Sequence, residues 1–325
     1  MIPSKHPMNK IIELLKNCRH VLVVSHINPD GDAVGSMMAL GMALESLNIK
    51  TTLLNESAIS DQYSFLPKIE TMVRSIGDVR EYDAAVVLDC GEMERVGKSA
   101  AAIGRIPLVV NIDHHVTNTM FGDYRIIDAN ACATAEILFH LITEMDVQIN
   151  KEIATAIYTG ILTDTGSFRF SNTTASVFDI CAKMVGFGAD PAEIAENIYQ
   201  THSFARVKLL KLALESIELL NDKRIGLMRI TRDMIEKAGA SPHDMDGFID
   251  YPRGIKNVEV AALIKELDGG RPGDAPFYHV SLRSSGNVDV AAFASQYGGG
   301  GHARAAAFDS NSSVSDLKSM ISGLL

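Results

Sequence analysis

Residues 21–32 read Val-Leu-Val-Val-Ser-His-Ile-Asn-Pro-Asp-Gly-Asp, and this stretch decides the fold of the first half of the chain. The four apolar residues that open it are typical of a strand buried on both faces, as strands are in parallel sheets. Pro29 and Gly31 then favour a tight polar loop, and a helical pattern of apolar residues covers 33–47. The stretch therefore predicts a strand, a loop and a helix, which is the beginning of a β-α-β unit.

The same alternation continues along the chain. Short apolar runs at 51–54, 84–88 and 107–112 predict further strands, and a helical pattern covers 95–103. The later helical patterns cover residues 132–144, 151–162, 173–185 and 204–220. Because parallel strands need crossover helices, we expect an α/β fold with a doubly wound parallel sheet covered on both faces.

The length of 325 residues exceeds what one hydrophobic core usually organises, so we expect two domains. We predict a catalytic domain at 1–200, a helical linker at 201–223 and a smaller α/β domain at 224–325. The patterns of the second domain predict strands at 225–230, 258–265 and 277–283 and helices at 288–296 and 314–325. A run of four glycines and a histidine, 298–302, follows the first of these helices.

Composition and charge narrow the class of function. A net charge of −10 argues against a basic face that grips duplex DNA, although carboxylates that hold cations leave small anionic substrates open. No segment approaches the ~20 apolar residues that a membrane span needs. The four cysteines have no C-x-x-C spacing, which is typical of reduced core thiols. We therefore expect a cytoplasmic protein that binds neither duplex DNA nor a membrane.

Metal-ligating side chains gather at the ends of the predicted strands. They are His26, Asp30, Asp32, Asp89, Asp113, His114 and His115. Since the carboxyl ends of parallel strands meet at one edge of a sheet, these groups should converge in one crevice. Several carboxylates in one place repel one another unless they are protonated or neutralised, so a centre with two divalent metal ions is the simplest resolution. Carboxylate oxygen with imidazole nitrogen favours Mn²⁺, with Mg²⁺ or Co²⁺ as alternatives.

Each of these motifs also has a purely structural interpretation. Asp30 and Asp32 are suitable turn and N-cap residues for the helix at 33–47, and a histidine pair is often only a polar turn. Asp164, which follows an apolar helix and precedes Gly166, could cap the next element. The glycine run is either a flexible loop or a place where a ligand closely approaches the backbone.

Together the motifs resemble the DHH phosphoesterase superfamily, which is named for the triplet at 113–115. The resemblance covers nearly the whole chain and rests on four ordered motifs, followed by the glycine run as a fifth. Within the superfamily the chain is similar to NrnA-like enzymes, which degrade very short RNA and dephosphorylate 3′-phosphoadenosine 5′-phosphate. One departure is Ala307, which stands where the glycine motif of that subgroup usually ends in glycine.

The resemblance implies a role for each matched residue. One metal ion would be held by His26, Asp30 and Asp89. The other would be held by Asp32, Asp89, His114 and Asp164. Asp89 would thus bridge two ions about 3.5 to 4 Å apart, the spacing at which a bridging water becomes a nucleophile.

The resemblance also implies contacts with the substrate. His115 would touch the phosphate or the leaving oxygen, while Asp113 would orient a neighbouring imidazole. The residues expected to bind the far end of the substrate are Arg283, Gly299, Gly300, Gly301 and His302, with Arg169 as a weaker candidate. Arg283 could instead be a solvated surface charge.

The implied activity is the hydrolysis of short oligoribonucleotides to mononucleotides and of 3′-phosphoadenosine 5′-phosphate to AMP. The rival enzymes are a RecJ-like single-strand exonuclease, a linear dinucleotide phosphodiesterase and a family II pyrophosphatase, whose lysine-rich C-terminal signature is missing here. RecJ-like enzymes carry additional nucleic-acid-binding domains, for which we expect no room. A non-catalytic nucleotide-binding regulator is the alternative from another class. The oligomeric state is left open, with a homodimer as one option.

Overall fold

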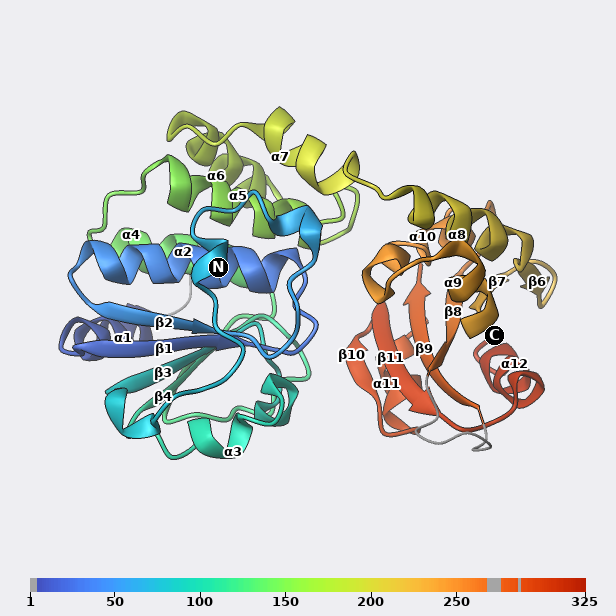
Figure 1. Ribbon diagram of the computed structural model, residues 1–325, viewed down its shortest axis with the longest axis horizontal. Coiled ribbons are helices and arrows are strands. Elements are labelled where there is room, and N and C mark those ends of the chain that lie inside the picture. The colour runs from blue at the N-terminus through green and yellow to red at the C-terminus, as the bar shows by residue number, and fades with distance from the viewer. Residues whose placement is uncertain (1–4, 268–275, 286–287) are drawn as a thin grey trace. The chain divides into compact units, whose positions relative to one another are not determined.

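The structure is a computed structural model that describes residues 5–267, 276–285 and 288–325. It divides into two compact units, Met1–Thr201 and His202–Leu325, each of which contains a sheet with helices packed on it (Figure 1). The segment predicted as a linker forms α8 (Phe204–Glu215) and β6 (Glu218–Leu220). Both elements belong to the second unit, where β6 pairs with the neighbouring strand and α8 packs in the core.

The first unit contains a five-stranded parallel sheet with the order β2-β1-β3-β4-β5. Its strands are β1 (His20–Ser25), β2 (Lys50–Leu54), β3 (Ala84–Leu88), β4 (Val109–Asp113) and β5 (Tyr124–Ile127). The sequence predicted the first four, and the α/β class with a parallel sheet is confirmed. The short edge strand β5 was missed, since only one of its four residues is fully buried.

Helices cover both faces of this sheet (Figure 1). They are α1 (Lys5–Lys16), α2 (Gly31–Ser46), α3 (Ala100–Ile103), α4 (Thr134–Glu144), α5 (Lys151–Asp164), α6 (Ala175–Gly186) and α7 (Pro191–Tyr199). Val21 and Val23 pack in the core under α2, α4 and α5, whereas Leu22 and Val24 pack in a second core on the side of α3. Burial on both sides explains the unbroken apolar run of β1.

Two helix predictions were wrong in detail. The pattern at 95–103 forms two short helices, the 3-10 helix Met93–Val96 and α3, because Gly97 between them has a φ of +103°. That left-handed conformation ends a helix. The helix predicted at 204–220 ends at Glu215, and its last three residues form β6. The helices α1 and α7 were not predicted.

The second unit contains a six-stranded mixed sheet with the order β10-β11-β9-β8-β7-β6. Its further strands are β7 (Ile225–Ile230), β8 (Val260–Leu267), β9 (Phe277–Ser284), β10 (Gly300–His302) and β11 (Ala305–Ser310). Its further helices are α9 (Arg232–Ala238), α10 (Asp250–Arg253), α11 (Val290–Ser295) and α12 (Val314–Ser322). The second half of the glycine run is therefore an edge strand rather than a loop, and β11 was not predicted.

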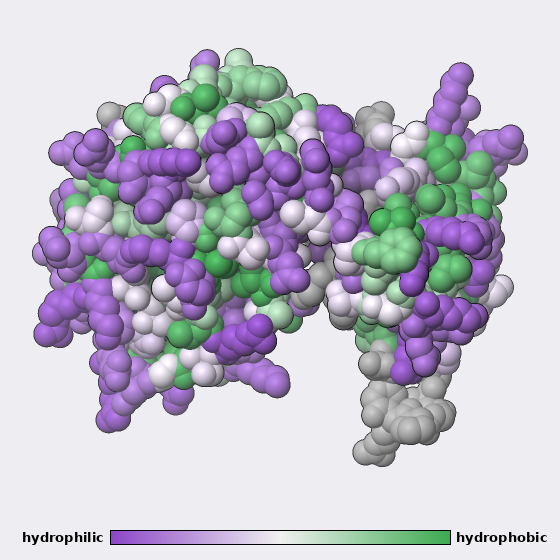
Figure 2. All heavy atoms as spheres, turned by 45° about the horizontal axis from the view of Figure 1, so that its top comes forward, coloured by the Kyte–Doolittle hydropathy of each residue, from purple (hydrophilic) through white to green (hydrophobic). Residues whose placement is uncertain are grey.

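The sequence predicted no membrane-spanning segment, and the surface and the helices can be compared with that expectation. Figure 2 shows a face on which polar side chains predominate and apolar residues occur between them in small patches. In the part of the chain that the structure describes, every helix is too short or too polar to cross a membrane.

Candidate metal centre

The strand order places the candidate site at a reversal of the sheet. β2 and β3 lie on opposite sides of β1, so the chain leaves the ends of β1 and β3 in opposite directions. In sheets of this order the crevice at the carboxyl ends of those two strands is where ligands bind. His26 directly follows β1 and Asp89 directly follows β3, so both residues lie at this position.

His26 and His114 are oriented in the same way. In each, Nδ1 donates to a backbone carbonyl, that of Ile27 at 2.9 Å for His26 and that of Ala131 at 3.3 Å for His114. This leaves Nε2 of both rings facing carboxylates, and both side chains are buried. A second-nitrogen bond of this kind fixes the tautomer and the ring orientation of metal-binding histidines.

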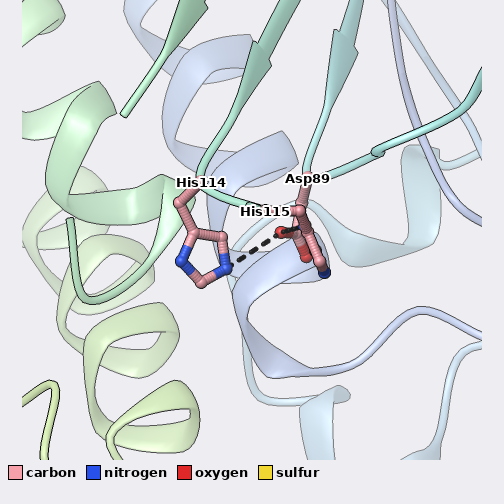
Figure 3. A group of neighbouring side chains, drawn as sticks. All are labelled: Asp89, His114 and His115. Atoms are coloured by element: carbon pink, nitrogen blue, oxygen red, sulfur yellow. Dashed lines mark ion pairs between the residues drawn. The ribbon is translucent and has the colours of Figure 1, made fainter. Parts of the chain in front are cut away.

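Asp89 is the centre of the group, as Figure 3 shows for two of its partners. Its carboxylate lies 3.5 Å from Nε2 of His26, 3.5 Å from Nε2 of His114 and 3.6 Å from Nδ1 of His115. Two sets of three residues each bring one donor atom per residue within 4.8 Å of the others. The sets are Asp89, His114 and His115, and His26, Asp30 and Asp89. Asp89 is the member that both sets share.

Asp113 holds His115 rather than facing the group directly. The Nδ1–H of His115 donates to Oδ1 of Asp113 at 2.6 Å, and the amide of Asn118 donates to Oδ2 at 2.6 Å. Asp113 is fully buried, and both bonds lower its pKa although burial by itself would raise it. The bond to Asp113 fixes the orientation of the His115 ring.

Asp30 caps the helix that the structural interpretation expected, whereas Asp32 caps a different one. Oδ1 of Asp30 accepts from the backbone of Asp32 and Ala33 at the start of α2. The carboxylate of Asp32 instead caps α4, where it accepts from the N–H of Thr134, 102 residues further along, and it also lies 3.9 Å from Nε2 of His114. Capping and metal binding are compatible, since a carboxylate has lone pairs for both.

Asp164 is the last residue of α5, not part of the loop after it. One of its carboxylate oxygens lies 3.8 Å from Nε2 of His114. The side-chain amide of Asn172 donates to the backbone carbonyl of Asp164 at 3.2 Å and to that of Cys132 at 3.0 Å. Asn172 therefore ties the end of α5 to the segment before α4.

The charges of the cluster suit divalent cations. Four buried or half-buried carboxylates and the exposed carboxylate of Asp30 face three imidazoles, so the ionised group would carry excess negative charge. Burial and neighbouring carboxylates raise the pKa of Asp32, and they raise that of Asp164 to about 7. Burial would lower the pKa of His114, but Asp164, Asp89 and Asp32 raise it to about 9. Oxygen and nitrogen donors with unbalanced negative charge fit Mn²⁺, Mg²⁺ or a similar ion.

Several residues of the site were missed by sequence reasoning. They are Asn55, Asn118, Thr134 and Asn172. Each is a single polar residue in a loop or at a helix start. Its part in the site cannot be recognised from the sequence until its hydrogen-bond partner is known. Asn55, for example, donates to the carbonyl of His26 and to the hydroxyl of Ser25.

Arg169 lies in the turn after Asp164 and is exposed. Its Nε donates to the carbonyl of Gly166 at 2.6 Å, so part of its guanidinium stabilises its own turn. Its role toward a substrate stays a prediction.

In the second unit, the backbones of His302 and Arg283 lie in one row across the sheet. His302 pairs with Ala305 on β11, and Ala305 pairs with Arg283 on β9. Arg283 is half-buried, and its guanidinium donates to the carbonyl of Leu282 at 3.0 Å. The side chain of His302 lies outside the described residues.

The glycine run is explained largely by the fold itself. A Cβ on Gly299 would lie 2.1 Å from the carbonyl oxygen of Ala307, and one on Gly301 would lie 2.3 Å from that of Ala305. Gly298 has a φ of +77°. Gly300 differs from these three, because a Cβ there would meet nothing within 4 Å. Close approach of β11 thus accounts for Gly299 and Gly301, the positive φ accounts for Gly298, and a ligand contact stays a prediction.

The parallel sheet and the histidine and aspartate cluster define an α/β protein with a site able to hold divalent metal ions. The sequence pattern of the DHH family, N-terminal domain, matches residues 20–161, and that of the DHHA1 domain matches residues 227–324. The bifunctional oligoribonuclease and PAP phosphatase NrnA of Thermus thermophilus is 33% identical over 301 residues, 92% of this chain and 87% of that protein. The chain belongs to the DHH family of phosphoesterases.

Two solved structures show the same fold. An exopolyphosphatase-related protein from Bacteroides fragilis matches with a TM-score of 0.89 and 24% identity, over 99% of this chain and 96% of that one. RecJ from Thermus thermophilus, solved in complex with Mn²⁺, matches with a TM-score of 0.56 and 10% identity, over 99% of this chain and 55% of that one.

Proposed function

We propose that this chain hydrolyses short oligoribonucleotides to mononucleotides and removes the 3′-phosphate of 3′-phosphoadenosine 5′-phosphate to leave AMP. The observation that carries the proposal is the convergence of three imidazoles on the Asp89 carboxylate at the reversal of the sheet. The Thermus relative, which covers nearly the whole chain, is named for both activities. The four cysteines are free thiols, which supports a cytoplasmic location.

The proposed cofactor is a pair of divalent ions, with Mn²⁺ preferred. One ion would be held by His26, Asp30 and Asp89. The other would be held by Asp32, Asp89, His114 and Asp164. When bound, such a pair acidifies water and neutralises charge on the phosphoryl oxygens.

The side chains around this centre would orient the substrate and move protons. Asp113 holds the Nδ1–H of His115, so Nε2 of His115 can contact a phosphate oxygen or give a proton to the leaving oxygen. In the second unit, Arg283 and the backbone of Gly299, Gly300 and Gly301, with His302, are proposed to bind a phosphate of the substrate.

A panel of substrates tests this function. The full chain with Mn²⁺ is given 3′-phosphoadenosine 5′-phosphate, RNA dimers to pentamers, linear diadenylate, a long single strand and pyrophosphate, and initial rates are compared. We expect the fastest turnover for RNA dimers to pentamers and for 3′-phosphoadenosine 5′-phosphate.

Charge-assisted hydrogen bonds contribute ~1.5–3 kcal/mol, so Arg283→Gln should raise KM roughly 10- to 100-fold.

Other outcomes of the panel would separate the alternatives. Equal turnover of the long strand and the dimer would favour a RecJ-like exonuclease, and pyrophosphate as the best substrate would favour a pyrophosphatase. Binding of these nucleotides without any release of product would support the regulatory alternative. Gly300→Ala tests the proposed substrate contact of the glycine run separately from the fold, because the added methyl group has open space in the fold.

Metal binding is expected to release protons. Asp164, with a pKa raised to about 7, and His114, with a pKa raised to about 9, must lose their protons before they can hold a cation. The affinity for Mn²⁺ should therefore rise with pH between about 6 and 9. Calorimetric titration at pH 7.5 in buffers of different ionisation enthalpy measures the protons released. A heat of binding that is the same in all buffers would contradict the expectation.

A further inference from the structure

Thr134, the first residue of α4, contacts two carboxylates of the candidate metal centre at once. Its hydroxyl donates to Oδ1 of Asp89 at 3.1 Å. Its backbone N–H donates to Oδ2 of Asp32 at 2.6 Å. Thr134 is fully buried, and the two carboxylates it contacts are at most 2% exposed. These bonds are therefore shielded from bulk solvent.

The start of α4 depends on Asp32. The N-cap residue of this helix is Ala133, which has no side chain that could accept from the free N–H groups of the first turn. Asp32 accepts instead, from Thr134 and, at 2.9 Å, from Ala135. The positive end of the helix dipole also favours a carboxylate at this place. Asp32 is therefore fixed by the backbone of another helix.

The segment before Thr134 is fixed as well. The carboxylate of Glu136 accepts from the N–H of Cys132 at 2.7 Å, and the amide of Asn172 donates to the carbonyl of Cys132 at 3.0 Å. The position of Thr134 is thus set by bonds to both sides of the helix start. A hydroxyl on a rigid helix start can restrain the carboxylate that it contacts.

We propose that Thr134 is a positioning residue, which holds Asp89 through its hydroxyl and Asp32 through its amide and so keeps both carboxylates in place to bind metal ions. The inference rests on the proposed metal-dependent function and deepens it. Asp89 and Asp32 are both proposed metal ligands, so a shift of either carboxylate would weaken the binding of metal ions. Residues that orient metal ligands in this way typically change metal affinity or activity ~10- to 100-fold when altered.

The test compares Mn²⁺ affinity of the full chain by calorimetry for Thr134→Val and Thr134→Ser. Valine keeps the shape and the backbone N–H but lacks the hydroxyl, so it is expected to weaken Mn²⁺ binding ~10- to 100-fold. Serine keeps the hydroxyl and should bind Mn²⁺ like the native chain. Thr159→Val is the matched control, since Thr159 is equally buried and its hydroxyl bonds only the carbonyl of Thr155 in its own helix.

The outcomes separate this inference from the proposed function. Native-like Mn²⁺ affinity of Thr134→Val would overturn the inference, and so would equal weakening by serine and valine, because packing would then be the cause. If the valine variant does not fold, as judged by circular dichroism, Thr134→Ala removes the hydroxyl without adding an atom and decides the question. A native chain that binds Mn²⁺ but cleaves no substrate of the panel would contradict the proposed function and leave the role of Thr134 intact.

Discussion

Asp89→Asn is expected to lower Mn²⁺-dependent phosphate release by ~10³-fold, more than the ~10- to 100-fold typical when only a neighbour of a ligand is changed. The substitution keeps the size of the side chain but replaces one oxygen by an NH₂ group and removes the charge. Among the residues that the structure describes, Asp89 is the one carboxylate that His26, His114 and His115 all approach. An amide there can neither bridge two cations nor balance the imidazoles.

The measurement is the initial rate of phosphate release from 3′-phosphoadenosine 5′-phosphate across a range of Mn²⁺ concentrations. Asp128→Asn is the matched control, because Asp128 also follows a strand of the same sheet, β5, and its carboxylate bonds the backbone of Asn130. This variant should keep native rates. Native rates for Asp89→Asn as well would rule out the proposed centre.

Gly35→Val is expected to lower the free energy of unfolding by about 3 kcal/mol, at the upper end of the effect of overpacking. A Cβ on Gly35 would lie 2.5 Å from the carbonyl oxygen of Ala156 and 3.1 Å from the backbone nitrogen of Gly160. Both atoms belong to the backbone of α5, so relief requires that α2 and α5 move apart. Valine also adds two further carbons in this place.

The effect should extend to the site, because α2 carries Asp30 and Asp32 at its start and α5 ends at Asp164. We expect urea unfolding to show the loss of stability and calorimetry to show weaker Mn²⁺ binding in the same variant. Gly186→Val is the control, since a Cβ on Gly186 at the end of α6 meets nothing within 4 Å. Equal stability of the two variants would show that α2 and α5 do not pack as closely as described.

Much of the fold follows from local pattern. The apolar runs of β1 and β3 reveal strands with two buried faces, and polar residues after them mark the carboxyl edge of a parallel sheet. Two of the strands that were not predicted lack such a pattern. The edge strand β5 is half exposed, and β10 consists of glycine and histidine, so neither shows the periodicity of a buried strand.

The sequence by itself determined the α/β class, the parallel sheet and the set of histidines and aspartates that would meet at one edge. It did so because apolar periodicity reports burial, and strand ends in a parallel sheet share an edge. Only the tertiary structure decided how these groups are held. Asp32 caps α4, Asp113 holds His115, and Thr134 contacts Asp89.

The physical reason is that these contacts join residues far apart in the sequence. The hydrogen bond between residues 32 and 134 cannot be predicted from the local sequence around either residue. It forms only once the helices have packed on the sheet. The same holds for the glycine run, where the sequence could not distinguish a ligand from a neighbouring strand. In the structure, β10 pairs with β11 through the backbone, and this pairing brings the backbone of β11 close to Gly299 and Gly301.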